Sequence, residues 1–166
     1  MSRWRPPPPK SSPYISTAGY RRLEDELKQL WQQRAEVVQA LSAAAAEGDR
    51  SENAEYIYRK KQLREMDRRI GYLQRRMPEL HIISAPPPDR RRIYFGAQVT
   101  LEDDHGTQVV YRIVGADEFD PAGHCISIDA PLAQALLKKT VDDEAEVITP
   151  AGKMRYYIVE VSYSES

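Results

Sequence analysis

Two stretches of the chain carry apolar side chains at alternating intervals of three and four residues, the spacing of a coiled-coil seam on an α-helix. The first stretch follows Ser16, a residue type suited to a helix N-cap, and is interrupted by one polar residue, Arg34. Its seam positions are Tyr20, Leu23, Leu27, Leu30, Val37 and Leu41. The second seam consists of Tyr56, Arg59, Leu63, Met66, Ile70, Leu73, Met77 and Leu80. Each stretch therefore predicts a long amphipathic helix.

The two seams match each other in an antiparallel arrangement. In such a hairpin the residue numbers of facing layers add to a constant, and Leu27 with Leu73 gives 100. The same constant joins Tyr20 to Leu80, Leu23 to Met77, Leu30 to Ile70, Arg34 to Met66, Val37 to Leu63, Leu41 to Arg59 and Ala44 to Tyr56. We therefore predict an antiparallel α-helical coiled-coil hairpin over residues 15–80, with its tip near 48–53 and a length of about 42 Å.

The rest of the chain reads differently. Residues 1–14 are rich in proline and basic, which predicts a disordered tail, and three consecutive prolines with a basic run predict a linker over residues 81–93. Beyond it a period of two predicts strands at 98–102, 109–114, 124–128, 146–149 and 155–163, with a short helix from Pro131. The predicted fold class is α+β, with residues 94–166 forming a small antiparallel β domain.

Charge divides the chain into two halves. Residues 1–90 hold 17 Lys and Arg against 12 Asp and Glu, whereas residues 91–166 hold 7 against 13. This asymmetry indicates that the first half meets nucleic acid or another polyanion. The single cysteine, Cys125, excludes an internal disulfide framework and a cysteine-based zinc site, so we expect no cofactor on the isolated chain.

The absence of a long apolar run and of a signal-peptide pattern predicts a soluble, cytoplasmic protein without membrane association. Because the seam positions are used within the hairpin, we expect a monomer.

The predicted tip, GDRSENAEY at residues 48–56, carries two carboxylates that have two interpretations. Asp49 followed three residues later by Glu52 approximates a capping box for the second helix, and Ser51 is an alternative cap. Alternatively, the pair completes a Mg²⁺ site that another macromolecule and its nucleic acid already half supply, because two carboxylates alone hold this ion weakly.

The second arm is strongly basic. Lys60, Arg64 and Arg68 step by four and share a face, which would suit contact with a nucleic-acid backbone. The alternative is a solvated face with pairs such as Lys61 with Glu65.

Two separate motifs resemble the bacterial Gre transcript-cleavage factors, and within them the GreB branch: GDRSENAEY followed by KKQLREMDRRIGYL, and YRIVGADE…ISIDAPLAQALLKKTVDDEAEVITPAG. The resemblance runs from Ser16 to Tyr163. It implies a hairpin that enters the secondary channel of a backtracked RNA polymerase, where Asp49 and Glu52 help to hold the second catalytic Mg²⁺. The polymerase then cuts the 3′ end of the nascent RNA, so the protein is an activator rather than an enzyme.

The same resemblance implies that Lys60, Lys61 and Arg64 contact the RNA. It also implies an FKBP-like C-terminal domain that docks on the polymerase rim through Asp129 and Pro131, where Ala130 replaces a serine common in the GreB branch. Three other functions fit parts of the sequence: an FKBP-like isomerase or chaperone, a channel regulator without cleavage activity, and a structural coiled-coil adaptor. The intact acidic pair argues against the regulator, and the adaptor does not explain the charged tip.

Overall fold

The computed structural model describes residues 10–48 and 53–164. The chain forms two compact units. One unit is helical and comprises Ala18–Leu80, and the other combines the residues up to Thr17 with the chain from His81 onward. Residues 1–9 of the predicted tail lie outside the described residues.

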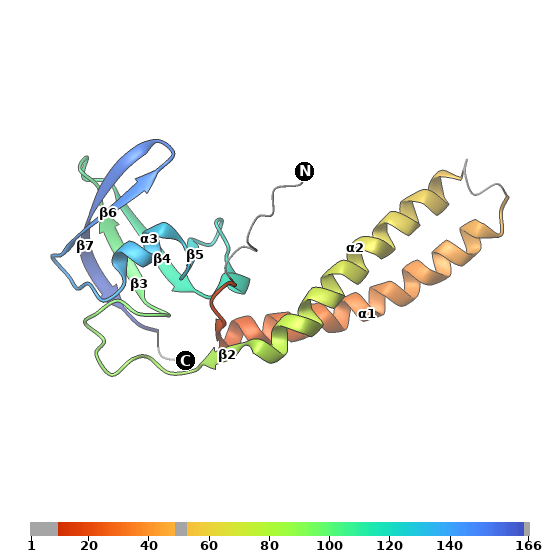
Figure 1. Ribbon diagram of the computed structural model, residues 1–166, viewed down its shortest axis with the longest axis horizontal. Coiled ribbons are helices and arrows are strands. Elements are labelled where there is room, and N and C mark those ends of the chain that lie inside the picture. The colour runs from red at the N-terminus through yellow and green to blue at the C-terminus, as the bar shows by residue number, and fades with distance from the viewer. Residues whose placement is uncertain (1–9, 49–52, 165–166) are drawn as a thin grey trace, which may run out of the picture. The chain divides into compact units, whose positions relative to one another are not determined.

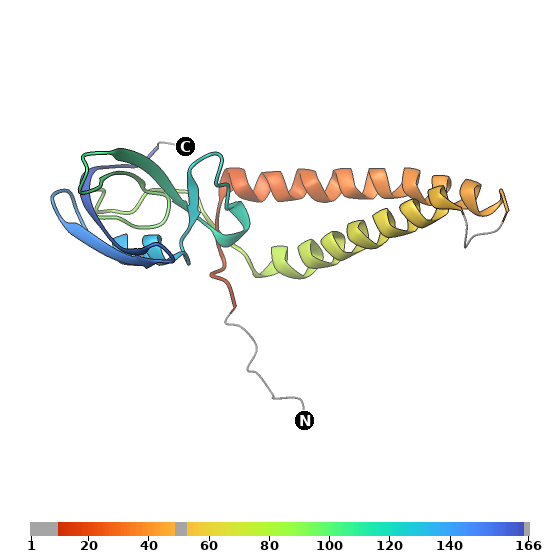
Figure 2. The same cartoon turned by 90° about the horizontal axis from the view of Figure 1, so that it is seen from above.

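The helical unit is an antiparallel hairpin, in which α1 (Thr17–Ala45) and α2 (Ala54–Arg76) lie side by side in both views (Figures 1 and 2). Neither glycine nor proline interrupts α1 between Tyr20 and Glu47, and α2 passes into a short 3₁₀ helix, η1 (Met77–Glu79), at Pro78. Every predicted seam position is buried or half-buried. The predicted seams are therefore confirmed.

Two ion pairs join the helices beside the seam. The Arg34 guanidinium lies 2.6 Å from the Asp67 carboxylate, and Arg69 donates two hydrogen bonds to Glu26 at 2.6 and 3.0 Å. The hydrogen bond and the negative charge of Asp67 raise the pKa of Arg34. These pairs lie close to the predicted register, so they reinforce the alignment that the apolar layers set.

The other unit begins with a two-stranded parallel sheet. Strand β1 (Tyr14–Ser16) pairs with β2 (His81–Ile83), and Ile15 at its centre is fully buried. The sequence placed Tyr14 in the tail, residues 15–16 in the hairpin and β2 in the linker, and it missed both strands because neither has more than three residues and they are far apart in the chain. The pairing brings together the segments that precede α1 and follow α2.

A buried carboxylate fixes β1. Glu118, which is 8% exposed, accepts hydrogen bonds from the backbone N–H of Ser16 at 3.1 Å and of Gly115 at 2.8 Å, and also from the Ser16 hydroxyl. Glu118 ends the 3₁₀ helix η2 (Ala116–Glu118). The strand before α1 is therefore bonded to the loop that follows β4.

A curled five-stranded sheet, in the order β5-β4-β3-β7-β6, forms the rest of this unit (Figure 1). The strands are β3 (Gln98–Glu102), β4 (Gln108–Val114), β5 (Cys125–Ser127), β6 (Glu144–Thr149) and β7 (Gly152–Ser162). The helix α3 (Pro131–Leu136) contributes Leu136 to a core with Ile93, Leu101, Ile113 and Ile158, all at most 1% exposed. The predicted strands and short helix are present at nearly the predicted positions.

One strand pairing differs from the prediction. Strands β4 and β5 are parallel, so the expectation of a wholly antiparallel sheet is wrong for this pair. The chain between them contains η2 and reverses again at an antiparallel bridge between Asp120 and Cys125. Because of this second reversal, β5 runs in the same direction as β4. Among the helices of the described chain, none is long and apolar enough to cross a membrane.

We predict that Gly115→Ala destabilises the β-containing unit by about 1–3 kcal/mol, because a Cβ at this position would lie 1.9 Å from the Tyr14 carbonyl oxygen. Urea unfolding followed by circular dichroism, with amide exchange of residues 14–16 and 81–83, measures the effect. Gly71→Ala in α2 is the control, because its Cβ would meet only the flexible end of Arg75 and a helical alanine stabilises by roughly 0.5–1 kcal/mol. Equal stability of Gly115→Ala and wild type would contradict the close approach.

Candidate functional site

The tip of the hairpin is defined by the residues on either side of it, since Asp49 and Glu52 lie outside the described residues. The end of α1 tightens, because the N–H of Ala46 donates both to the Ser42 carbonyl four residues back and to the Ala43 carbonyl three residues back, and the N–H of Glu47 donates to the Ala44 carbonyl three residues back. Gly48 follows with φ +133°, a value that favours glycine. The chain therefore leaves α1 at a defined point.

Asn53 joins the two helices at the tip. Its side-chain oxygen accepts a hydrogen bond from the N–H of Tyr56 at 3.1 Å, which caps α2. Its side-chain nitrogen donates to the carbonyl of Ala44 at 2.7 Å, at the end of α1. One amide side chain thus bonds to an N–H in the first turn of α2 and to a carbonyl near the end of α1, which also accepts from the N–H of Glu47.

This cap corrects the interpretation of the tip. The N-cap of α2 is Asn53, so the interpretation of Asp49 with Glu52 as a capping box is wrong, and so is the alternative of Ser51 as the cap. The first helical residue is Ala54. The start of α2 therefore has a capping side chain that is neither Asp49 nor Glu52.

The predicted basic residues Lys60, Lys61 and Arg64 are all exposed on α2. Within the described part of the chain, no ion pair involves any of the three, so the alternative pairing of Lys61 with Glu65 is absent there. The Lys60 ammonium lies 5.7 Å from the centroid of the Tyr56 ring. The three side chains on this face of α2 therefore carry positive charges that no ion pair within the described chain neutralises.

Two exposed apolar side chains next to these cations were missed in the sequence. Ile57 and Tyr58 are 53% and 58% exposed, and the Arg59 guanidinium lies 5.4 Å from the Tyr58 ring centroid. The signal was available, because neither residue belongs to the seam. Aromatic side chains among cations are the composition of surfaces that bind single-stranded nucleic acid.

The predicted docking residues lie together in the β-containing unit. Asp129 and Pro131 are both exposed, and Pro131 is the first residue of α3. The Asp129 carboxylate accepts hydrogen bonds from the backbone N–H of Ser12 at 2.8 Å and from the Ser12 hydroxyl. Ser12 belongs to the predicted tail, so this part of the tail contacts the folded unit.

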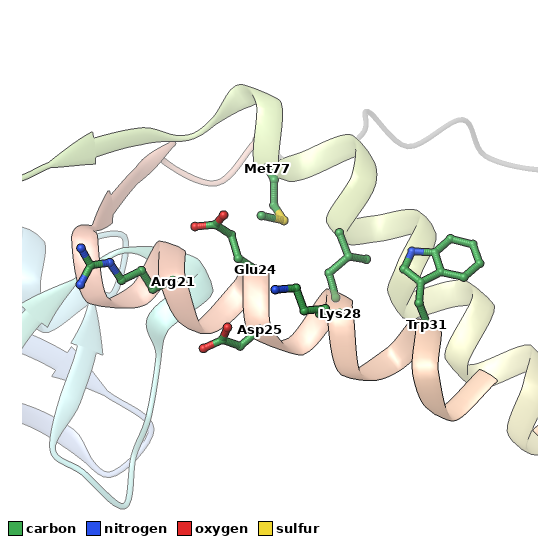
Figure 3. A pocket seen from close by; sticks show the side chains of 7 residues that line it. Arg21, Glu24, Asp25, Lys28, Trp31 and Met77 are labelled. Atoms are coloured by element: carbon green, nitrogen blue, oxygen red, sulfur yellow. The ribbon is translucent and has the colours of Figure 1, made fainter. Parts of the chain in front are cut away.

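The described residues contain no group of three or more His, Cys, Asp or Glu that could hold a metal ion. A pocket of about 500 Å³ lies near the other end of the hairpin, beside Trp31 and Met77 (Figure 3). None of the residues that the sequence singled out as a site lines this pocket.

Known proteins match the chain over nearly its whole length. The family model for the N-terminal domain of transcription elongation factors, GreA_GreB_N, matches residues 13–82, and the model described as transcription elongation factor, GreA/GreB, C-term, matches residues 87–163. The chain is 56% identical to transcription elongation factor GreB of Xanthomonas axonopodis pv. citri (strain 306), with 99% of both chains covered. It is 52% identical to transcription elongation factor GreB of Pseudomonas aeruginosa, with 98% of both covered.

Solved structures also match the chain. The GreA factor homolog 1 (Gfh1) of Thermus thermophilus is 23% identical, with 89% of this chain and 97% of that chain covered and a TM-score of 0.40. The transcription elongation factor GreA/GreB of Nitrosomonas europaea is 22% identical, with 92% and 100% covered and a TM-score of 0.42.

We predict that Asn53→Ala destabilises the start of α2 by about 1–2 kcal/mol, because the N–H of Tyr56 loses its capping bond and the carbonyl of Ala44 loses the bond from Asn53 while it keeps the one from Glu47. Amide exchange at Tyr56 and Ile57 measures the loss. Ser51→Ala is the matched control, and it should leave exchange at these amides unchanged. Faster exchange in Ser51→Ala than in Asn53→Ala would contradict the assignment of the cap.

Proposed function

Because this chain belongs to the GreA/GreB family of transcription elongation factors, we propose that it binds RNA polymerase and stimulates cleavage of the 3′ end of the nascent RNA in backtracked complexes. Membership confirms the resemblance seen in the tip and in the C-terminal motif. The hairpin is a long pair of helices, so it would enter the secondary channel while the other unit of the chain stays outside.

The observation that carries this proposal is the cap of α2. Asn53 caps α2 and also bonds to the end of α1, so the capping role considered for Asp49 with Glu52 is taken by another residue. Two acidic residues in four positions at a helical tip then call for a different explanation. Chemistry at a site supplied by a partner is the explanation that uses both charges.

Asp49 and Glu52 would contribute carboxylate oxygens to a shared Mg²⁺, a hard cation that prefers such donors. The described residues offer no further acidic cluster to complete a site, which fits a metal held jointly with the polymerase rather than by this chain alone. When bound, the ion would activate a water and stabilise the charge of the cleavage transition state. The protein would thus act in trans, without a nuclease site of its own.

The basic face of α2 would hold the displaced RNA. Lys60, Lys61 and Arg64 begin about two helical turns after the cap, and they are exposed without ion-pair partners in the described chain. The exposed ring of Tyr58 adds a surface on which a base can stack. Salt-dependent contact with phosphates and stacking on tyrosine would together orient the RNA toward the acidic tip.

Asp129 and Pro131 would dock on the rim of the polymerase. Both are exposed at the start of α3, Pro131 as its first residue and Asp129 just before its N-cap Ala130. The backbone N–H of Asp129 also donates to the Ser127 hydroxyl at 3.1 Å, which orders the loop before the helix.

We predict that the wild-type protein stimulates RNA cleavage in a stalled, backtracked polymerase complex with Mg²⁺, and that the double variant Asp49→Ala, Glu52→Ala loses at least about 100-fold of this stimulation while it still binds. The loss follows because removal of groups that stabilise a transition state typically lowers rates by factors of this order. Cleavage gels with a parallel binding measurement test it.

The matched control removes two exposed carboxylates from the middle of the hairpin, Glu36→Ala and Glu65→Ala, and should keep the stimulation. If wild type binds the complex without stimulating cleavage, the protein is instead a channel regulator, and the proposed chemistry at the tip is wrong.

We also predict that the triple variant Lys60→Ala, Lys61→Ala, Arg64→Ala weakens crosslinking of the RNA 3′ segment to the hairpin and makes the remaining contact less dependent on salt, with a slope reduced by about 2 for single-stranded RNA. The control removes three exposed cations from α1, in the variant Arg21→Ala, Arg22→Ala, Lys28→Ala. Equal weakening by both variants would show that general charge, and not this face, attracts the RNA.

A further inference from the structure

A second group of cations lies in the β-containing unit, at a place where two distant segments meet. Arg90, Arg91 and Arg92 come from the chain before β3, and Lys138 and Lys139 follow α3. The N–H of Ile93 donates to the carbonyl of Lys139 at 2.9 Å, and the N–H of Lys138 donates to the carbonyl of Ile93 at 2.8 Å. We call these five cationic residues the cationic ridge.

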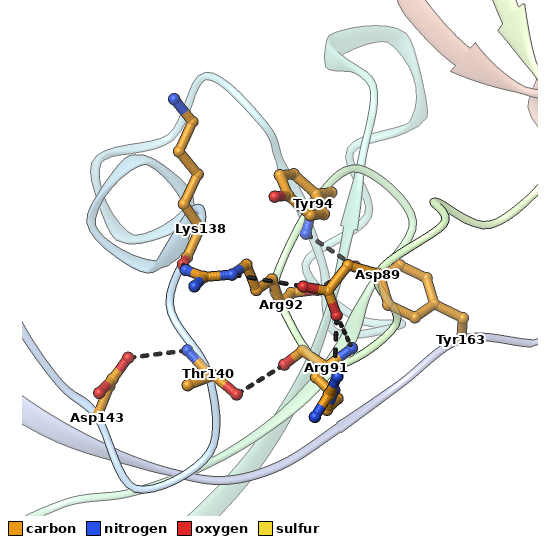
Figure 4. Close-up of polar contacts among 8 residues, drawn as sticks. All are labelled: Asp89, Arg91, Arg92, Tyr94, Lys138, Thr140, Asp143 and Tyr163. Atoms are coloured by element: carbon orange, nitrogen blue, oxygen red, sulfur yellow. Dashed lines mark hydrogen bonds and ion pairs between the residues drawn. The ribbon is translucent and has the colours of Figure 1, made fainter.

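The backbone of the cationic ridge is held from both sides. The Tyr163 hydroxyl donates to the carbonyl of Arg92 at 2.6 Å and accepts from the N–H of Tyr94 at 2.8 Å, and the Thr140 hydroxyl donates to the carbonyl of Arg91 at 2.9 Å (Figure 4). Burial raises the pKa of Tyr163, so its hydroxyl keeps the proton that it donates. Cations on a fixed backbone lose less conformational freedom when a ligand binds.

Side-chain contacts also organise the ridge. The Arg92 guanidinium donates to the carbonyl of Lys138 at 3.0 Å and lies 3.4 Å from the Asp89 carboxylate. Figure 4 shows the Lys138 side chain extending away from this ion pair. Arg91 is 93% exposed and lies only at 3.9 Å from Asp89. The Arg92 side chain is therefore used in contacts within the ridge, whereas Arg91 and Lys138 extend their charged groups toward solvent.

The ridge carries a surplus of positive charge. Five cations stand against three carboxylates in residues 88–94 and 137–143, namely Asp89, Asp142 and Asp143, and the last accepts a hydrogen bond from the N–H of Thr140 at 2.9 Å. Within the described chain neither Lys138 nor Lys139 takes part in an ion pair. Four of the five cations lie in residues 91–166, whose net charge is −6, so the ridge is a positive patch in an acidic half of the chain and selects a polyanionic ligand.

The composition of the ridge favours nucleic acid over an acidic protein surface. Protein interfaces have an apolar centre with aromatic anchors. In the described residues 88–94 and 137–143, Val141 is the one exposed large hydrophobic side chain. Contact with phosphates needs no such centre, because Lys and Arg neutralise the charges directly.

The same composition favours a duplex over a single strand. Surfaces for single strands use exposed aromatic rings on which bases stack, whereas Tyr94 and Tyr163 beside the ridge are half-buried. A DNA duplex carries one phosphate charge per about 1.7 Å of its axis, so a rigid row of cations meets several phosphates at once. We propose that the cationic ridge binds the phosphate backbone of double-stranded DNA, independently of sequence and independently of the cleavage function proposed above.

The test is binding of the full chain to a fluorescent 20-base-pair DNA duplex without polymerase, followed by anisotropy over a range of salt concentrations. The double variant Arg91→Gln, Lys138→Gln should lower the affinity about tenfold at roughly 50 mM salt and reduce the salt slope by about 1.8, as expected for two lost phosphate contacts. Both side chains project from the ridge, so their replacement leaves the Arg92 contacts intact.

The matched control is Lys153→Gln, Arg155→Gln, which removes two exposed cations of β7 that are paired with Glu146 and Glu144 and gives the same net charge. It should bind the duplex like wild type. Equal loss in both double variants, or no loss in the ridge variant, would overturn the proposal. Displacement of the duplex by poly-L-glutamate at equal charge concentration would also overturn it and would assign the ridge to an acidic protein surface.

Discussion

The hydrogen bonds to the buried Glu118 carboxylate hold strand β1, the segment of the β-containing unit that directly precedes α1. This side chain accepts from the backbone of Ser16 and Gly115 and from the Ser16 hydroxyl, so it fixes the residue that immediately precedes α1. The parallel pairing of β1 with β2 adds the segment that follows α2. The segments that precede α1 and follow α2 thus belong to one hydrogen-bonded structure, although Ser16 and Leu80 lie 64 positions apart along the chain.

Sequence patterns with a long period were sufficient for most of the fold. The seam residues of both helices, such as Leu23 and Leu73, repeat over many turns, so a single antiparallel register satisfies all of them. Strands β3 and β7 were likewise predicted from the alternation of apolar and polar residues and from the turn residues beside each strand. Strands β1 and β2 have three residues each, which is too short for a period to appear. Their partners are fixed by tertiary contacts, and so is the parallel direction of β5.

The tip shows a different limit. Asp49, Ser51 and Asn53 are all good capping residues, and local chemistry does not rank them. The choice of Asn53 depends on its second hydrogen bond, to Ala44 in the other helix, which no local pattern reveals. The docking residues were identified by resemblance and the basic face by spacing and resemblance together; the structure adds that these residues are exposed and that Asp129 accepts a hydrogen bond from Ser12. Tyr58 and the cationic ridge were not identified from the sequence, because their residues were assigned to a helix or a linker. Whether an aromatic ring near a group of cations is exposed, as for Tyr58, or half-buried, as beside the ridge, is decided only by the fold.

Because β1 pairs with β2, the helical hairpin is an insertion within the sequence of the β-containing unit. Its two arms share a seven-residue repeat, so removal of one heptad from each arm at facing positions leaves every remaining layer opposite its partner. Such a paired deletion would shorten the hairpin by about 10 Å while Asn53 and Glu118 keep their partners. The architecture therefore allows the reach of the tip to evolve in discrete steps, separately from the chemistry at either end.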